Sequence, residues 1–119
     1  DETMKMLHVT IQTAKFEETI RFYREVAGLE IQSDMRPQGR NIVFLADSPG
    51  ETCVEIIENP AAADSGSEHL SVGFQADDVE SLRLELEKRG YAPTPMVSPA
   101  PGVKFFFVKD PAGVKVQFM

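Results

Sequence analysis

Two histidines, a glutamate and a glutamine stand where their side chains could together bind a metal ion. The chain has two histidines, His8 and His69, and each precedes a carboxylate or amide in the same half: Glu55 after 47 residues and Gln117 after 48. Imidazole nitrogen and carboxylate oxygen are ligands for borderline divalent ions, and a glutamine can add a neutral oxygen. In octahedral coordination, four such ligands leave two positions open for a substrate or water, as a catalytic metal requires.

The segments that carry these residues are repeated. Residues 8–11 and 69–72 both read histidine, aliphatic, small hydroxyl, aliphatic, and a pattern with helical periodicity follows each of them. In the second half, Asp77 and Glu80 resemble a capping box at the start of the helix. Each expected helix has an apolar face and ends at a glycine: Phe16, Ile20, Tyr23, Ala27 and then Gly28; Val79, Leu82, Leu86 and then Gly90.

Each half therefore reads as a βαβββ module, and the fold class that we predict is α+β. The modules span residues 4–58 and 69–119, and residues 59–68 form a linker rich in Pro, Gly and Ser. We expect one domain over 1–119, with the proline-rich stretch 93–102 as a loop. Further strands are expected near 29–35, 40–46 and 53–57 in the first module, and near 91–97, 103–109 and 114–118 in the second.

Strand alternation predicts that the four polar residues share one side of the sheet. Successive side chains of a strand point to opposite faces, so the apolar set of each strand lies opposite its polar residue. We expect the helices to cover the apolar faces from outside, with the polar residues on the concave side of a curved mixed sheet. The expected apolar positions are Leu7, Val9, Ile11, Val54, Ile56, Leu70, Val72, Phe74, Val114, Val116 and Phe118.

The composition and net charge of the chain exclude several classes of binding partner. The formal net charge of −7 argues against binding to nucleic acids or to anionic membranes, because both require a basic surface. No apolar run reaches the roughly 18 to 20 residues of a membrane span. A single cysteine, Cys53, excludes an intrachain disulfide. These features predict a cytoplasmic protein that acts on a small molecule.

The chain resembles the vicinal-oxygen-chelate superfamily, and within it the glyoxalase I branch. The similarity extends from His8 to Gln117. The last of its motifs looks like the family signature F-x-x-D-P-x-G-x-x-[IV]-E, with Gln117 in place of the usual glutamate. The residues that carry the resemblance are His8, Phe22-Tyr23, Gly28-Leu29, Val54-Glu55-Ile56, Glu68-His69-Leu70-Ser71-Val72 and Phe107 to Gln117.

This resemblance implies an activity and a set of ligands. His8, Glu55, His69 and Gln117 would bind one divalent ion per site, with Zn, Ni or Co favoured and Fe or Mn compatible. The implied reaction isomerises the hemithioacetal of an α-oxo-aldehyde and a thiol to a 2-hydroxyacyl thioester, through an enediolate that the metal stabilises. Because Gln117 cannot accept a proton, Glu55 would be the catalytic base. Asn59 matches a residue that contacts glutathione.

The resemblance also implies a homodimer whose two sites lie at the interface, although a site within one chain remains open. Three other functions are compatible with the same fold. A ring-cleaving dioxygenase would use two histidines and a carboxylate around Fe(II). An epimerase of acyl thioesters would share the enolate chemistry, and a metal-free antibiotic-binding module would need no ligand set. The fold alone does not separate these functions.

Overall fold

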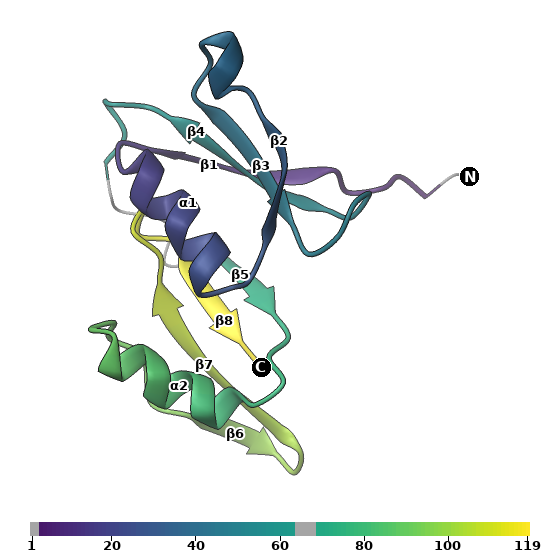
Figure 1. Ribbon diagram of the computed structural model, residues 1–119. Helices are drawn as coiled ribbons and strands as arrows, with labels where there is room; N and C mark the ends of the chain where they lie inside the picture. The colour runs from purple at the N-terminus through teal and green to yellow at the C-terminus, as the bar shows by residue number, and fades with distance from the viewer. Residues whose placement is uncertain (1–2, 64–68) are drawn as a thin grey trace. The chain divides into compact units, whose positions relative to one another are not determined.

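The computed structural model describes residues 3–63 and 69–119. The chain divides into two compact units, 1–64 and 65–119, which are described one at a time below (Figure 1). The predicted linker 59–68 lies outside the described residues from 64 onward. No α-helix in the described part of the chain combines the length and the apolar character needed to cross a membrane.

The first unit is a mixed four-stranded sheet with one α-helix on one of its faces. The strand order is β1-β4-β3-β2, in which β1 runs parallel to β4 and the other neighbours are antiparallel. The predicted β-α-β-β-β order is therefore confirmed for this half. The elements are β1 His8–Thr13, α1 Phe16–Glu25, β2 Glu30–Asp34, the 3-10 turn η1 Arg36–Gln38, β3 Ile42–Ala46 and β4 Cys53–Glu58.

The second unit repeats this arrangement. Its strand order is β5-β8-β7-β6, again with the first strand parallel to the last. The α2 helix lies against β7 (Figure 1). The α+β class and the two-module organisation are thus confirmed. The elements are β5 Ser71–Phe74, α2 Val79–Lys88, β6 Val97–Ala100, β7 Val103–Lys109 and β8 Lys115–Phe118.

The core of each unit follows the periodicities of the sequence. On α1, Phe16, Ile20 and Tyr23 are buried as the helical pattern predicts, whereas Ala27 lies beyond the end of the helix. On the sheets, alternate residues of the central strands are buried, because only one face of each sheet is covered by its helix. These buried strand residues are Val43, Leu45, Val54 and Ile56 in the first unit and Phe106, Val108, Val116 and Phe118 in the second.

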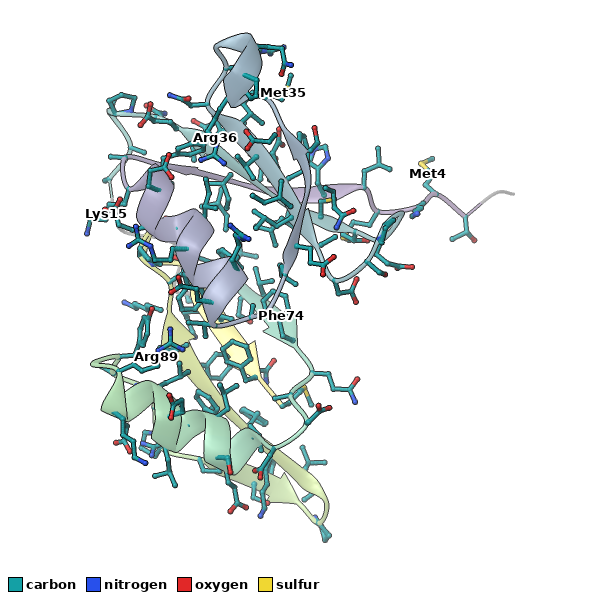
Figure 2. The ribbon with its side chains drawn as sticks, viewed as in Figure 1. Met4, Lys15, Met35, Arg36, Phe74 and Arg89 are labelled. Carbon is teal, nitrogen blue, oxygen red and sulfur yellow. The ribbon has the colours of Figure 1, made fainter. Side chains whose placement is uncertain are left out.

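An arginine ties the turn after β2 to the start of α1. Arg36, labelled in Figure 2, donates to Asp34 at 2.9 Å from Nε and 2.6 Å from Nη2, and to Glu17 at 3.3 Å. The hydrogen bonds from the Arg36 side chain and backbone lower the pKa of Asp34 from 3.8 to about 2. This ion-pair network fixes the hairpin relative to the helix, and the residues belong to the same unit.

The cap of α2 differs from the prediction by one residue. Asp78, in extended conformation, is the N-cap, and its carboxylate accepts from the backbone N–H of Ser81 at 3.1 Å. Asp77, the predicted cap, precedes it. The prediction was wrong because the capping-box spacing to Glu80 favours Asp77, whereas an aspartate at either position can cap a helix and the backbone conformation decides which one faces the first turn.

The proline-rich stretch contains a strand where a loop was predicted. β6, Val97–Ala100, lies within 93–102, and it overlaps the strand expected at 91–97 only at Val97, its first residue. Its pairing with β7 is interrupted between Val97 and Ala100, where Pro99 lies. An edge strand tolerates proline because one of its sides needs no backbone donors.

The apolar faces are not covered along their whole length. Ile11 is buried, but Leu7, which precedes β1, and Val9, near its start, are 67% and 41% exposed. Leu70, which lies before β5, is 71% exposed. The prediction that the helices cover every apolar position is therefore wrong at these residues, which precede their strands or lie next to the first strand residue.

Candidate functional site

Three polar side chains converge on one face of the first unit. In the parallel pair β1–β4, Thr10 lies directly opposite Glu55, and His8 lies two residues earlier on β1. The hydroxyl of Thr10 donates to Oε1 of Glu55 at 2.5 Å, and Nε2 of His8 is 3.5 Å from the same oxygen. Phe44 on β3 meets the imidazole edge to face, with ring centroids 5.7 Å apart. We call His8, Thr10 and Glu55 the polar cluster.

The surroundings of the polar cluster allow it to meet a ligand. The side chain of Glu55 is 12% exposed and that of His8 is 41% exposed, so the carboxylate is partly removed from water while the imidazole reaches solvent. A partly buried carboxylate binds hydrogen-bond donors and cations more strongly than one in bulk water. The cluster thus offers an anionic acceptor and an imidazole on a shared surface.

The corresponding face of the second unit carries an amide and aromatic rings. Gln117 on β8 lies opposite Gly73 on β5 and opposite Phe107 on β7. A Cβ atom at Gly73 would stand 3.6 Å from Oε1 of Gln117, so the glycine leaves the amide uncovered on that side. Phe105 meets Phe107 edge to face, with centroids 5.8 Å apart.

The second histidine is not the counterpart of the first. β1 begins at His8 and α1 at Phe16, while β5 begins at Ser71 and α2 at Val79, so each pair of starts is 63 residues apart. His69 lies before β5 and is exposed. In the second unit, the place that His8 occupies in the first is therefore held by Ser71.

The strand ladders give the same result independently. Glu55 is paired with Thr10, two residues after the first histidine, and Gln117 is paired with Gly73, two residues after Ser71. The interpretation that both histidines occupy equivalent repeat positions is therefore wrong by two residues. A shift of two keeps the side chain on the same face, which is why alternation did not reveal it.

This register changes the donor set that the repeat offers to a metal ion. The first unit supplies an imidazole and a carboxylate, whereas the matched positions of the second supply the hydroxyl of Ser71 and the amide of Gln117, both neutral and weak ligands. Over residues 3–63 and 69–119, no group of three or more His, Cys, Asp or Glu side chains is placed to hold a metal. The matched positions of the repeat supply one histidine and not the two that the predicted ligand set contains. A joint site of His69 and Gln117 with His8 and Glu55 stays a prediction.

Asn59, predicted to contact substrate, takes part in local structure. Its amide nitrogen donates to Gln12 at 2.8 Å, and its side-chain oxygen accepts from the backbone of Ala61 at 3.0 Å. Sequence reasoning overlooked Thr10, although its position two residues after His8 puts both on one face. It also overlooked Ser71, which a comparison of the helix starts would have identified.

The family comparison covers nearly the whole chain. The model of the Glyoxalase/Bleomycin resistance protein/Dioxygenase superfamily matches residues 5–118. A search of curated protein sequences finds no match.

Solved structures with similar folds have different activities. The trypanothione-dependent glyoxalase I of Leishmania major aligns with a TM-score of 0.77 and 23% identity, over 98% of this chain and 86% of that one. TnmS3, an antibiotic-binding protein from Streptomyces sp. CB03234, aligns with a TM-score of 0.74 and 18% identity, over 98% and 94%. The lactoylglutathione lyase of Agrobacterium tumefaciens aligns with a TM-score of 0.70 and 18% identity, over 99% and 94%. At these identities the likeness concerns the fold.

Proposed function

The chain belongs to the Glyoxalase/Bleomycin resistance protein/Dioxygenase superfamily, and we propose that it binds a small organic molecule through the polar cluster without a resident metal ion. The observation that carries this proposal is the strand register, which puts Ser71 and Gln117 where the first unit has His8 and Glu55. A hydroxyl and an amide are suited to hydrogen-bonding a ligand and are poor at retaining a divalent ion.

The polar cluster can bind a ligand by itself. The carboxylate of Glu55 accepts from Thr10 on one oxygen and keeps acceptor capacity for a ligand N–H or O–H. The exposed imidazole of His8 adds a donor or an acceptor, according to its tautomer. A protein of similar fold, TnmS3, is an antibiotic-binding protein, so a binding role is compatible with this fold.

A second candidate is the metal-dependent, glyoxalase I-like lyase. It is favoured by the convergence of His8 and Glu55, whose Nε2 and Oε1 atoms lie 3.5 Å apart, close enough to share one cation. In that case His8, Glu55, His69 and Gln117 would hold Zn, Ni or Co, and the ion would supply Lewis acidity toward the oxygens of a hemithioacetal. Glu55 would accept the substrate proton, and Asn59 would contact the thiol portion.

Metal analysis distinguishes the two candidates. We would load the protein with Ni, Co, Zn or Mn, remove the free ion, and measure the bound metal by elemental analysis, for the unchanged chain and for His8→Ala. The binding proposal predicts well under one ion per chain, with no effect of the substitution. About one ion per chain, lost in His8→Ala, would refute it and would support the lyase.

Ligand binding gives the positive test. A thermal-shift screen of small organic molecules, including antibiotics and hemithioacetals, would be run in the presence of a chelator. We expect stabilising ligands whose effect grows with concentration and is lost in Glu55→Gln. Hits that require added metal, or that bind Glu55→Gln equally well, would contradict the role of the polar cluster.

We also propose that the protein assembles as a homodimer. Leu7, which precedes β1, and Val9, near its start, are 67% and 41% exposed, and apolar surface of this kind is often covered by a partner. Sedimentation analysis should give about twice the mass of one chain. Leu7→Ser together with Val9→Ser should shift the equilibrium to monomer, and a monomeric unchanged protein would contradict this proposal.

A further inference from the structure

The first unit contains a hollow of about 390 Å³ that is lined by one face of α1, by the residue before β2 and by η1. Five of its seven lining residues are charged and three of these five are arginines, whereas acidic residues outnumber basic ones by 19 to 12 in the whole chain. The hollow therefore concentrates positive charge in an acidic protein. Its lining residues are Glu17, Ile20, Arg21, Arg24, Glu25, Leu29 and Arg36.

The carboxylates beside the hollow already have partners. Nη1 of Arg36, labelled in Figure 2, lies 3.3 Å from both oxygens of Glu17, and its Nε and Nη2 atoms bind Asp34. Glu25 also interacts with another residue. Glu17 precedes Arg21 by four residues, the spacing of a helical ion pair, yet its carboxylate is directed to η1 instead. The acidic side chains of the wall are thus engaged elsewhere.

Arg21 and Arg24 are the cations that remain available. Both are exposed and stand three residues apart on α1, so their side chains are neighbours on the surface of the helix. Within residues 3–63 and 69–119, neither guanidinium takes part in a hydrogen bond or an ion pair. Arg24 lies in the last turn, where the helix dipole favours a cation, but Arg21 lies before that turn and has no such compensation. An anion between the two groups would offset their repulsion.

The chemistry of the wall defines the class of that anion. A guanidinium presents a fork of N–H donors that matches the oxygens of a carboxylate or a phosphate. Two unpaired positive charges favour a ligand with two negative charges, and a phosphate monoester carries about −1.5 to −2 near pH 7. Ile20 and Leu29 are 4% and 6% exposed, so the floor of the hollow offers little apolar surface. The ligand is therefore small and polar.

We propose that this hollow binds a phosphoryl dianion, free or at the end of a small ester, through the guanidinium groups of Arg21 and Arg24. The proposal goes beyond the function proposed above. It depends on neither His8 nor Glu55, and α1 covers the sheet face of Val54 and Ile56, whereas Glu55 lies between them on the opposite face.

The test is an NMR titration of the complete, ¹⁵N-labelled chain with inorganic phosphate and with glycerol 2-phosphate, at constant ionic strength and with a chelator. We expect saturable shifts of the arginine Nε–H signals, with a Kd of about 1 mM or tighter. Tighter binding of the ester would identify an ester as the ligand, and tighter binding of phosphate would identify the free ion; both results support the site. Arg21→Gln combined with Arg24→Gln should weaken binding at least about tenfold.

Two further variants keep the test decisive. Arg40→Gln is the matched control, because Arg40 is an exposed arginine of the same unit outside the hollow, and it should leave the affinity unchanged. Glu17→Gln removes a negative charge from the wall and should strengthen binding about two- to fivefold, even if the double arginine variant folds poorly.

Three results would overturn the proposal: no saturable shift with either probe, equal losses in the double arginine variant and in Arg40→Gln, or weaker binding in Glu17→Gln. Glu55→Gln should bind both probes normally, so failure of this site and failure of the polar cluster give different results.

Discussion

The hydrogen bond between Thr10 and Glu55 provides a quantitative test of the polar cluster. Replacing Thr10 with valine keeps the shape of the side chain and removes the hydroxyl that donates to Oε1 at 2.5 Å. The side chain of Glu55 is 12% exposed, so water only partly replaces the lost donor. We therefore expect the carboxylate of Thr10→Val to be under-satisfied in the folded protein.

The magnitude follows from the type of bond and its exposure. A hydrogen bond to a charged group contributes about 1.5–3 kcal/mol in proteins. Thr10 is itself exposed, which favours the lower part of this range. Valine also forms strands well, so the substitution adds little loss of stability from strand propensity. We expect a pairwise coupling of about 1–2 kcal/mol, and a fall in Tm of about 4–8 °C per kcal/mol if the first unit melts cooperatively.

A double-mutant cycle isolates this coupling. The free energy of unfolding would be measured by urea denaturation for Thr10→Val, Glu55→Met and the double variant, so that effects of strand propensity cancel. Glu58 is the matched control: it lies on the same strand and accepts from Asn41 at 2.8 Å. Thr10→Val and Glu58→Gln should be additive. A Thr10–Glu55 coupling indistinguishable from zero would refute the existence of a hydrogen-bonded polar cluster.

Three further predictions concern the core, the ion pair and the register. Leu86→Ala removes a side chain that is 0% exposed on α2 and should cost about 2–5 kcal/mol in urea denaturation, whereas Leu84→Ala, at a position 56% exposed on the same helix, should change stability by less than about 0.5 kcal/mol. The pKa of Asp34 is lowered from 3.8 to about 2, so its ion pair stabilises the fold fully above about pH 4 and is lost progressively as the pH falls through the folded pKa. The stability difference between the unchanged chain and Asp34→Asn should therefore shrink steadily from about pH 5 to about pH 2, and a difference that stays constant over this interval would exclude the ion pair as its cause. Ser71→His combined with Gln117→Glu gives the second unit the pair that the first unit has, and should raise nickel or zinc affinity in a titration at least about tenfold, whereas no gain over Ser71→Ala combined with Gln117→Glu would contradict the register assignment.

Much of the fold was predictable because local periodicity carries the information. The apolar spacing of Phe16, Ile20 and Tyr23 predicts α1 and its buried face, and the alternation in 53–57 and 114–118 predicts the closing strands. Prediction was less successful where two local solutions satisfy the same rule. Asp77 and Asp78 are equally good caps by type, and Pro99 disfavours a strand that pairing with β7 nevertheless stabilises.

For the candidate site, the sequence by itself determined the face of the sheet, and only the tertiary structure decided which residues are partners. Side chains alternate with a period of two, so the sequence shows that His8 and Glu55 share a face, but it does not distinguish His69 from Ser71, which lie on the same side of their strand. The hydrogen-bond ladder removes this ambiguity by pairing Gln117 with Gly73 and Glu55 with Thr10. Strand pairing joins residues far apart in the chain, and that is why the ladder shows directly that Ser71, and not His69, holds the matched position of the second unit.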